Sequence, residues 1–201
     1  MEITKLALKQ KQKAIDVLVA AFFNYPMFDL YFPDPERRKQ VLPWYLGKVL
    51  NCALHYGEVY TNPEVTGVIF TLPPGHTKIS QWEYMQNGFA PAPFVLGLSD
   101  FIRSQACEDF VASQHEMHMN GIPHVYLWGL VVDPVYKKQG VGTALLQPVV
   151  EKADIEKMPI YLETHDVRNV DYYRRMDFQL VGSNTIPKSD VPIWCMMREP
   201  K

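Results

Sequence analysis

The chain has 201 residues, of which 47% are hydrophobic and 12% aromatic, and this composition indicates a folded globular protein rather than a disordered one. Its formal net charge of -2 at pH 7 argues against a protein that binds nucleic acid by neutralising many phosphates, so we expect no nucleic-acid partner. No segment approaches ~18 uninterrupted apolar residues or has the pattern of a signal peptide, which predicts a cytoplasmic protein without a membrane partner.

Hydrophobic periodicity and turn residues predict one mixed α/β domain over residues 1–201, with its chemistry in the C-terminal half. No repeat, low-complexity tract or linker interrupts the chain. In order, the predicted elements are a short strand (2–8), a helix (11–24), a helix (35–56), a hairpin (57–61 and 66–75), two or three helices (79–120), a long strand (124–134), a helix (143–158), a strand (159–166), a short helix (168–176) and a closing pair of strands (178–184 and 191–199).

Proline and capping residues set two of these boundaries. The pair Tyr25-Pro26 should end the first long helix, because a residue that precedes proline avoids helical geometry. Asp34 as N-cap and Pro35 at the first helical position predict the start of the second long helix, with a bend at Pro43.

The connection between the strand at 124–134 and the following helix carries Gly140 and Gly142. Such a turn exposes main-chain N–H groups that have no intrahelical partner, and the helix dipole adds about half a positive charge. Glycine permits a positive φ and the close approach of phosphate oxygens, so the turn is predicted to bind an anion. The spacing fits no Walker loop, and the dinucleotide pattern GxGxxG would need glycine where Leu145 stands. Taken alone, the two glycines also fit an ordinary tight turn.

The wider stretch "LVVDPVYKKQGVGTALLQPVVEKA" resembles the acetyl-CoA-binding motif of the GNAT superfamily of N-acetyltransferases. In that motif a strand ending in Val-x-Pro is followed by Arg/Gln-x-x-Gly-x-Gly/Ala and a helix. Val132, Pro134, Gly140 and Gly142 match it, whereas Lys137 stands where Arg or Gln is usual. The contacts made by this motif are largely main-chain, so the departure at Lys137 weakens the match only modestly.

A second stretch, "YLETHDVRNVDYYRRMDF", resembles the other half of the GNAT motif. Asn169, Tyr173 and Phe178 match its Asn, Tyr and Phe, while Asp177 replaces a glycine that closes a helix. Aspartate is a poorer residue than glycine in the left-handed conformation expected there, but it is tolerated.

The resemblance implies a fold and a division of labour along the chain. It is strong over residues 124–182, the implied acetyl-CoA-binding core. More weakly, "AAFFNYPMFDLYFPD", "GEVYTNPEVTGVIFTLPPG" and "ALLQPVV" resemble the puromycin N-acetyltransferase-like branch. The implied fold is α/β (α+β): a central mixed, mostly antiparallel sheet flanked by helices and splayed so that pantetheine enters between strands. Residues 79–120 would be an insertion on the acceptor side.

The resemblance also implies which residues contact acetyl-CoA, the expected cosubstrate. Main-chain groups of Leu130 and Val132 would bind the pantetheine arm. Asn169 would contact pantetheine or simply cap its helix, and Tyr173 would lie at the thioester. The turn residues expected to hold the diphosphate are Lys137, Lys138, Gln139, Gly140, Val141, Gly142 and Thr143.

The implied activity is transfer of the acetyl group to a primary amine by direct attack in a ternary complex. Tyr173 matches the family's general acid, and its neighbour Tyr172 is the weaker candidate because it faces elsewhere on a helix. Glu163 on the adjacent strand is our candidate base, with His165 and Tyr126 behind it. The open alternative is a non-catalytic acyl-CoA-binding or regulatory domain.

Other patterns carry weaker expectations. The segment "HEMH" has spacing HExH rather than HExxH, so we interpret His115, Glu116, His118 and His124 as a partly exposed polar helix end and expect no metal. Three widely spaced cysteines predict reduced thiols. The aromatic residues in 79–120 are first of all core candidates, although they could shape a pocket for a moderately hydrophobic amine. GNAT relatives often dimerise, which leaves a homodimer open.

Overall fold

The computed structural model describes residues 1–201 and consists of seven strands and eight α-helices. Short 3-10 turns at Leu8–Gln10 and Pro134–Tyr136, and a π-helical turn at Met85–Phe89, join some of these elements. The elements are β1 (Thr4–Lys5), α1 (Lys11–Phe22), α2 (Pro26–Tyr31), α3 (Pro35–Tyr56), β2 (Glu58–Thr61), β3 (Gly67–Leu72), α4 (Gln81–Tyr84), α5 (Ala92–Leu96), α6 (Leu98–Met119), β4 (Val125–Val132), α7 (Val141–Ile155), β5 (Ile160–Thr164), α8 (Val167–Arg174), β6 (Gln179–Thr185) and β7 (Pro192–Arg198).

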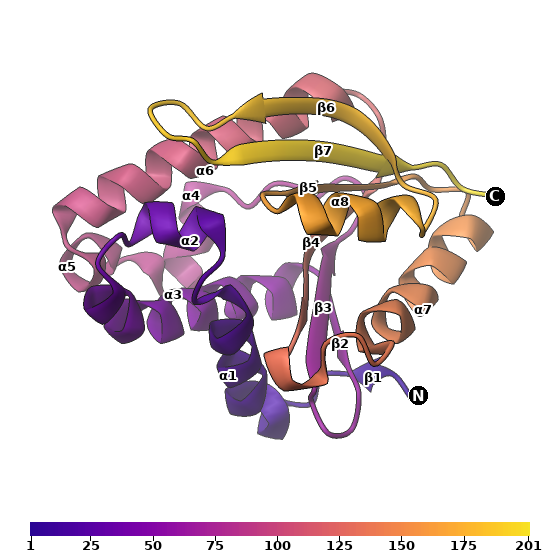
Figure 1. Cartoon of the computed structure of the whole chain (residues 1–201), viewed down its shortest axis with the longest axis horizontal. Coiled ribbons are helices and arrows are strands. Elements are labelled where there is room, and N and C mark those ends of the chain that lie inside the picture. Colours follow the sequence, from indigo (N-terminus) through magenta and orange to yellow (C-terminus); the bar gives the residue numbers. More distant parts are fainter.

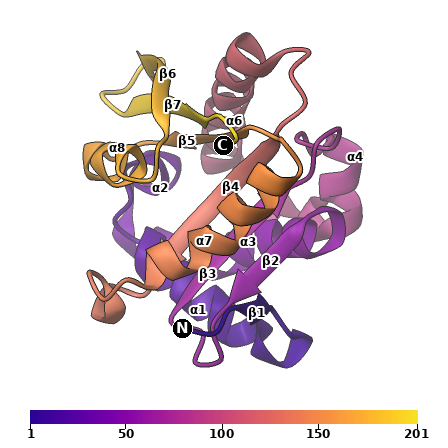
Figure 2. The same ribbon diagram turned by 90° about the vertical axis from the view of Figure 1, so that its right-hand side faces the viewer.

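All seven strands belong to one sheet in the order β1-β2-β3-β4-β5-β7-β6 (Figure 1). Every neighbouring pair is antiparallel except β4 and β5, which confirms the expected mixed, mostly antiparallel sheet. Figure 2 shows α7 in front of β3 and β4, with α1 and α3 behind them. On β3, Val68 and Phe70 belong to the core on the side of α1, α3 and α6, whereas Ile69 belongs to the core under α7 and α8. The alternation follows from the two-residue period of a strand.

The parallel pair β4 and β5 separates after a short contact. The two strands pair only at Val125 with Ile160 and at Tyr126 with Tyr161, and beyond these residues they diverge (Figure 1). On its other side β4 pairs with β3 through a bulge, because Phe70 lies opposite Gly129 and Thr71 opposite Leu127. A Cβ atom at Gly129 would lie 2.2 Å from the ring of Phe70, so only glycine fits there. The expected splay of the sheet is therefore present at its centre.

Several N-terminal predictions need correction. The Tyr25-Pro26 pair does follow the end of α1, but Pro26 also starts α2, a helix that the sequence pattern does not predict. Tyr25 is extended, as a residue before proline should be, and Pro26 occupies the first helical position, where its missing N–H is not needed. The opening strand covers only Thr4–Lys5 rather than 2–8. The insertion holds three helices, α4 to α6. Among all helices of the protein, none is long and apolar enough to cross a membrane.

The predicted start of α3 is confirmed in detail. The Asp34 side chain accepts a hydrogen bond of 3.0 Å from the main-chain N–H of Glu36, and Pro35 occupies the first helical position. The helix continues through Pro43 to Tyr56 without a break. Its buried face carries Tyr45, which reaches a cavity beside the sheet.

Candidate active site

Four of the predicted site residues meet in one cavity between the diverging strands. A cavity of about 150 Å³ is lined by Leu130 on β4, Glu163 on β5, and Asn169 and Tyr173 on α8. Its other walls include apolar side chains from α1, α2, α3 and α6. The splay of β4 and β5 creates this space, because paired strands would fill it with main-chain hydrogen bonds.

Glu163 is the buried carboxylate of this cavity, with its side chain 3% exposed. The Tyr126 hydroxyl donates a hydrogen bond of 2.8 Å to its Oε2 atom. Its Oε1 atom has no hydrogen-bond partner and lies 3.8 Å from Nδ1 of His115. Burial raises the pKa of Glu163 to about 8, although the Tyr126 hydrogen bond opposes this shift. A buried acid that titrates near neutral pH is suited to accept and release protons.

Tyr173 and Tyr172 face different ways, as predicted for adjacent residues of a helix. Tyr173 is buried at the cavity, its ring centre is 5.4 Å from that of Phe178, and burial raises the pKa of its hydroxyl well above the ordinary value. Tyr172 instead points to the start of α7: a Cβ atom at Gly142 would lie 3.4 Å from its hydroxyl oxygen. The Tyr172 hydroxyl is buried and has no hydrogen-bond partner.

Asn169 does not cap its helix, and the alternative that it does so is wrong. Asp166 is the N-cap of α8, where its side chain accepts a hydrogen bond of 2.9 Å from the main-chain N–H of Arg168. Asn169 lies farther along the helix and donates instead to Oγ1 of Thr164 at 3.0 Å. The hydroxyl of Tyr25 lies 3.2 Å from the same Oγ1 atom, so α8 and the loop before α2 meet at the end of β5.

His165, one of the two candidate bases behind Glu163, is held by a hydrogen bond to β7. The Nδ1 atom of His165 lies 2.9 Å from the carbonyl oxygen of Pro192, and burial lowers the pKa of this ring to about 4. His165 is thus held by β7 as a neutral ring.

Asp177 has φ of 66°, which confirms that the position matching the motif's second-half glycine is left-handed. Its carboxylate is ion-paired with Lys201.

The glycine turn has the backbone geometry that the sequence predicts. Gly140 is the N-cap of α7 with φ of 80°, a left-handed conformation. The main-chain N–H of Ala144 is the first to bond within the helix, to the carbonyl of Gly140. The amides of Val141, Gly142 and Thr143 therefore have no intrahelical acceptor. The side chain of Val132 lies alongside, 3.5 Å from the place of a Cβ atom at Gly142.

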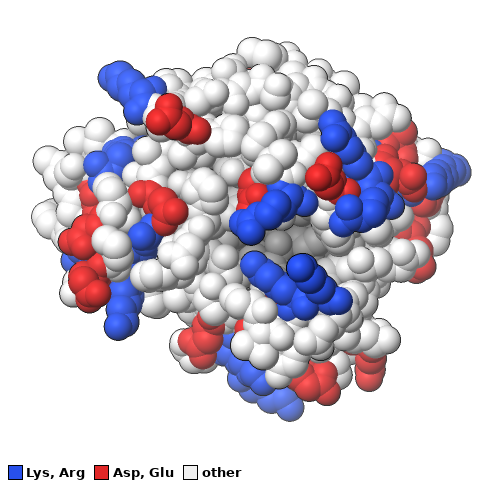
Figure 3. Space-filling view, viewed as in Figure 1, with Lys and Arg blue, Asp and Glu red and all other residues white.

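Basic side chains surround this turn. Figure 3 shows Lys and Arg side chains on both sides of a hollow, over the area that Figure 1 gives to α8 and the turn before α7. Lys137, Lys138 and Gln139 are exposed on the turn, and Lys137 is close enough to Asp166 to lower the pKa of that carboxyl together with Arg168. A local basic surface thus exists on a chain of near-neutral charge, and Arg168 of α8, which the sequence motif did not indicate, lies near it beside Asp166.

A second cavity continues from the first toward the insertion. It has a volume of about 410 Å³ and lies among α3, α6 and the segment from Thr77 to Pro93. Glu108 of α6 lines both cavities, and its Oε1 atom accepts hydrogen bonds from the hydroxyls of Tyr31 at 2.7 Å and Tyr45 at 3.1 Å. The sequence did not point to Glu108, since its partners lie on other helices and no local pattern marks it.

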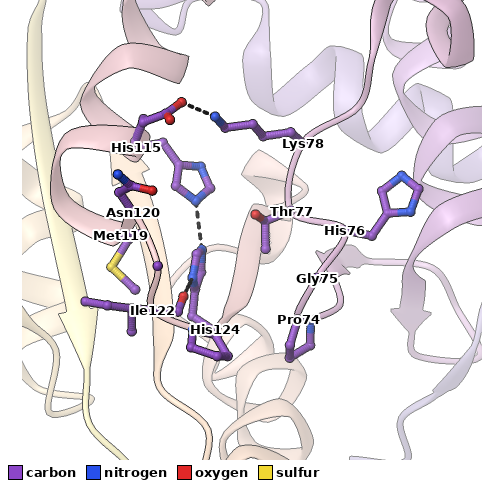
Figure 4. Close-up of a pocket in the computed structure, with 13 residues that line it drawn as sticks. Pro74, Gly75, His76, Thr77, Lys78, His115, Met119, Asn120, Ile122 and His124 are labelled. Carbon is purple, nitrogen blue, oxygen red and sulfur yellow. Dashed lines mark hydrogen bonds and ion pairs between the residues drawn. The ribbon is translucent and has the colours of Figure 1, made fainter.

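The expectation for the histidines is wrong in one respect. His115 and His124 are not an exposed helix end but are buried, with their Nε2 atoms 2.8 Å apart (Figure 4). The exposed Glu116 is ion-paired with Lys78, and His118 packs against Gly182. No three His, Cys, Asp or Glu side chains are grouped as a metal site.

Comparison with known families adds the decisive observation. Residues 20–178 match the family described as "Acetyltransferase (GNAT) family". The chain belongs to the GNAT family. An uncharacterized N-acetyltransferase of Schizosaccharomyces pombe is 22% identical over 210 residues, which cover 100% of this chain and 84% of the yeast protein. The narrower resemblance to the puromycin N-acetyltransferase-like branch stays a prediction.

Solved GNAT-like structures share the fold. A structure named as histone acetyltransferase HPA2 and related acetyltransferase from Corynebacterium glutamicum has a TM-score of 0.67 at 20% identity, covering 99% of this chain and 96% of that one. Arylalkylamine N-acetyltransferase 2 from Aedes aegypti has a TM-score of 0.62 at 12% identity, covering 100% and 98%. GNAT acetyltransferases are acyltransferases that use acetyl-CoA as cosubstrate.

Proposed function

We propose that this GNAT protein transfers the acetyl group of acetyl-CoA to a primary amine of a small molecule or an exposed amino group, by direct attack while both substrates are bound. The observation that carries the proposal is the single cavity at the splay of β4 and β5, whose walls include Glu163, Tyr173 and Leu130. The named activity of the yeast relative, an N-acetyltransferase, agrees with it.

The chain's residues fit the parts of acetyl-CoA. The amides of Val141, Gly142 and Thr143 would hold the diphosphate at the start of α7. The exposed side chains of Lys137 and Lys138 on the turn would add positive charge. Main-chain groups of Leu130 and Val132 would orient the pantetheine arm, and acetyl-CoA supplies the thioester whose acetyl group is transferred.

The proton steps follow from the two titratable residues. As the amine nitrogen bonds to the acetyl carbon and the carbon–sulfur bond breaks, Glu163 takes the proton that the nitrogen loses. A carboxyl with a pKa of about 8 is ionised in about a tenth of the molecules at pH 7, so the base is present but limiting. Tyr173 gives its hydroxyl proton to the sulfur and then regains one from water, so that once Glu163 has released its proton, one proton has moved from nitrogen to sulfur in total. Its raised pKa keeps the hydroxyl protonated at neutral pH, so that a proton is there to give.

A main-chain N–H of β4 beside Leu130 would also stabilise the carbonyl oxygen of the acetyl group as negative charge develops on it. Such a fixed donor contributes about 3 kcal/mol in comparable sites. A non-catalytic acyl-CoA-binding domain would need the glycine turn and the cleft, but it would have no use for a buried carboxyl without a counter-ion at the end of that cleft. The unpaired Oε1 atom of Glu163 therefore favours the enzyme.

The test combines calorimetry with an assay of CoA thiol release over a panel of amines. We expect CoA binding, thiol release with at least one amine, and a loss of turnover in Tyr173→Phe of about a hundredfold with CoA affinity retained. Absence of CoA binding together with absence of thiol release would end the proposal. Binding without turnover for any acceptor would support the regulatory alternative, and an unchanged kcat in Tyr173→Phe would remove Tyr173 as the acid.

A further inference from the structure

We infer that the acceptor is a primary amine with an apolar, aromatic-sized body, and that Glu108 binds its ammonium group before the reaction. This inference rests on the proposed function and adds the acceptor's chemical class. Its basis is the cavity of about 410 Å³ beside the insertion, which joins the cavity of Glu163 through shared walls at Glu108, Tyr126 and Trp128.

Glu108 is a carboxylate in need of a cation. Both nearby hydroxyls, from Tyr31 and Tyr45, donate to its Oε1 atom, which leaves Oε2 unpaired. No Lys, Arg or His of the chain forms an ion pair with it. Burial raises its pKa and the charge of Asp109 adds to the shift, while the two tyrosine hydrogen bonds oppose it, so a bound cation would favour its ionised form. A carboxylate taken out of water needs hydrogen bonds and an opposite charge, and the two tyrosines supply only the first.

The walls of this cavity select the rest of the acceptor. They are mostly aromatic and apolar side chains, with Tyr84, Phe89, Phe101 and Trp128 among them. Aromatic faces attract an ammonium and also bury an apolar body. The lysine of the wall, Lys78, is already ion-paired with Glu116. An amino acid would therefore bring its own carboxylate toward acidic residues without a free cation to receive it.

The position of Glu108 also suits the reaction. Glu108 and Glu163 line the same small cavity, and burial together with the charges of both carboxylates raises the pKa of Tyr126, which lines it with them. An ammonium bound at Glu108 would thus share a cavity with the carboxyl that takes a proton from its nitrogen. Binding by one acid and deprotonation by the other predicts that their variants affect different kinetic constants.

The test compares molecules that share one body. We expect 2-phenylethylamine to be acetylated with a kcat/KM about a hundredfold above that of phenylalanine, which differs by a carboxylate, and above that of ethanolamine, which lacks the ring. We expect Glu108→Gln to raise the KM for 2-phenylethylamine about tenfold or more with the Kd for CoA unchanged. Glu151→Gln, a charge removal on the exposed face of α7, should change neither constant.

A measurement on the unaltered protein guards against misfolding of the variant. 2-Phenylethanol has the same body without the cation, and it should inhibit at a concentration at least about tenfold above the KM of the amine. If phenylalanine and ethanolamine were acetylated with the same kcat/KM as 2-phenylethylamine, the acceptor class would be overturned. An unchanged KM in folded Glu108→Gln would overturn it as well. Either result would leave the acetyltransferase proposal standing. Absence of thiol release with every amine would overturn both.

An independent observation, the hydrogen bond between two buried histidines, carries a second inference. We propose that His115 and His124 pass the proton from Glu163 to a surface cavity at the C-terminal end of α6. The cavity has a volume of about 750 Å³, and exposed residues such as Lys78 and Asn120 form its rim (Figure 4).

The hydrogen bonds fix which nitrogen of each ring carries a hydrogen. Nδ1 of His124 lies 2.6 Å from the carbonyl oxygen of Ile122, which only accepts, so this nitrogen donates. In a neutral ring Nε2 of His124 is then an acceptor, and Nε2 of His115 must donate to it across 2.8 Å. That leaves Nδ1 of His115 without a hydrogen, 3.8 Å from the unpaired Oε1 atom of Glu163.

Each group can therefore accept on one side and donate on the other. A proton on Oε1 of Glu163 passes to Nδ1 of His115, and the Nε2 hydrogen of His115 passes to Nε2 of His124. The Nδ1 hydrogen of His124 then leaves its hydrogen bond with the carbonyl oxygen of Ile122 for water in the surface cavity. One proton enters and one leaves, and both rings change tautomer, so each ring must exchange its hydrogen with water before the next turnover. His115 and His124 act through Glu163, so they are positioning residues rather than groups that touch the substrate.

The surroundings keep both rings neutral at neutral pH. Burial lowers the pKa of His115 to about 4 and lowers that of His124. Neither ring is permanently protonated, so neither blocks the transfer. The titratable and charged groups that face the pair from α6, β4, β5 and the segment before α4 are Glu116, Tyr126, Tyr161, Glu163 and Lys78.

His124→Gln tests this relay, because glutamine can still accept the hydrogen bond from His115 but cannot pass a proton on. With any amine that the protein acetylates, we expect kcat to fall about tenfold with both KM values unchanged, and imidazole in the buffer to restore part of it. His118→Gln on α6, the helix that carries His115, should match the parent protein. An unchanged kcat in His124→Gln, or a loss that imidazole does not relieve in either His115→Ala or His124→Ala, would reduce the pair to a packing role.

Discussion

The two halves of the site differ in the kind of group that forms them, main-chain groups in one and side chains in the other. The proposed cofactor half consists of consecutive main-chain groups: the end of β4, the turn at Gly140 and the first amides of α7. The proposed acceptor half consists of side chains from helices far apart in the chain, such as Tyr31 on α2, Tyr45 on α3 and Glu108 on α6. A main-chain site requires glycine at fixed spacings, whereas a side-chain site is assembled only by the tertiary fold. The first kind leaves a pattern in the sequence and the second leaves none.

The largest expected effect comes from the residue where the two halves meet. Glu163→Gln keeps the volume and can still accept the Tyr126 hydrogen bond, but it cannot take a proton. We expect kcat to fall by on the order of a thousandfold, since a positioned base contributes about 10²–10⁴. Steady-state kinetics at pH 8 with saturating acetyl-CoA measure it.

The matched control for this variant is Glu151→Gln, which removes an equal charge from the exposed side of α7. The Kd for CoA should remain within about twofold in both, because the role proposed for Glu163 lies on the acceptor side of the thioester. A kcat in Glu163→Gln close to that of the control would mean that a water chain or another residue removes the proton.

Gly142→Ala isolates the cofactor half. A Cβ atom there would meet Tyr172 and Val132 at 3.4 and 3.5 Å, ordinary contact distances, so the fold accepts alanine. The methyl group would nevertheless occupy the side from which phosphate oxygens approach the amides. We expect the Kd for CoA to rise about tenfold to a hundredfold, or ~1.4–2.7 kcal/mol, in calorimetry.

Thermal unfolding shows whether a loss of CoA affinity in Gly142→Ala comes from the turn itself or from a destabilised fold. Alanine is the better helix former by about 0.5–1 kcal/mol, so Gly142→Ala should melt no lower than the parent protein. Gly47→Ala inside α3, with Ile15 at 3.4 Å, is the control that stabilises without touching the turn. Unchanged CoA affinity in Gly142→Ala would contradict a main-chain phosphate site.

The pH dependence sharpens the contrast between activity and stability. Because the pKa of Glu163 is raised to about 8, its ionised fraction and hence kcat should rise about tenfold between pH 7 and 9. The folded state holds this proton more tightly than the unfolded chain, so the stabilisation from it is complete below the ordinary pKa of 4.5 and is lost as pH rises to about 8. The melting temperature of Glu163→Gln should therefore rise relative to that of the parent protein from pH 5 to 8. A constant difference would show that Glu163 has an ordinary pKa.

The sequence predicted the parts of the molecule that depend on local rules. The Asp34 cap, the left-handed Gly140 and Asp177, and the alternating strands of the sheet all follow from backbone geometry within a few residues. The pair Tyr172 and Tyr173 could be assigned to different faces for the same reason, because successive helical residues point about 100° apart.

The remaining features depend on contacts that no local pattern records. The sequence predicts that Pro26 ends a helix, yet it also starts α2 after α1 has ended. His115 looks like part of a polar helix end, but α6 places it against His124 at the start of β4 and beside Glu163 on β5. Asn169 sits where a cap is plausible until Asp166 takes that place. Each correction is a tertiary contact overriding a sound local rule.

The smallest expected effect tests how far the cofactor half depends on main-chain atoms. Lys137 stands where the family's motif has Arg or Gln, and its side chain is exposed, with water free to screen its charge. An exposed ion pair is worth about 0.2–1 kcal/mol, so Lys137→Ala should raise the Kd for CoA by less than about fivefold in calorimetry. The effect should shrink further as salt is added, because screening acts on exposed charges first. A loss as large as that of Gly142→Ala would show that the turn binds phosphate through its side chains, and the contrast between the two halves of the site would disappear.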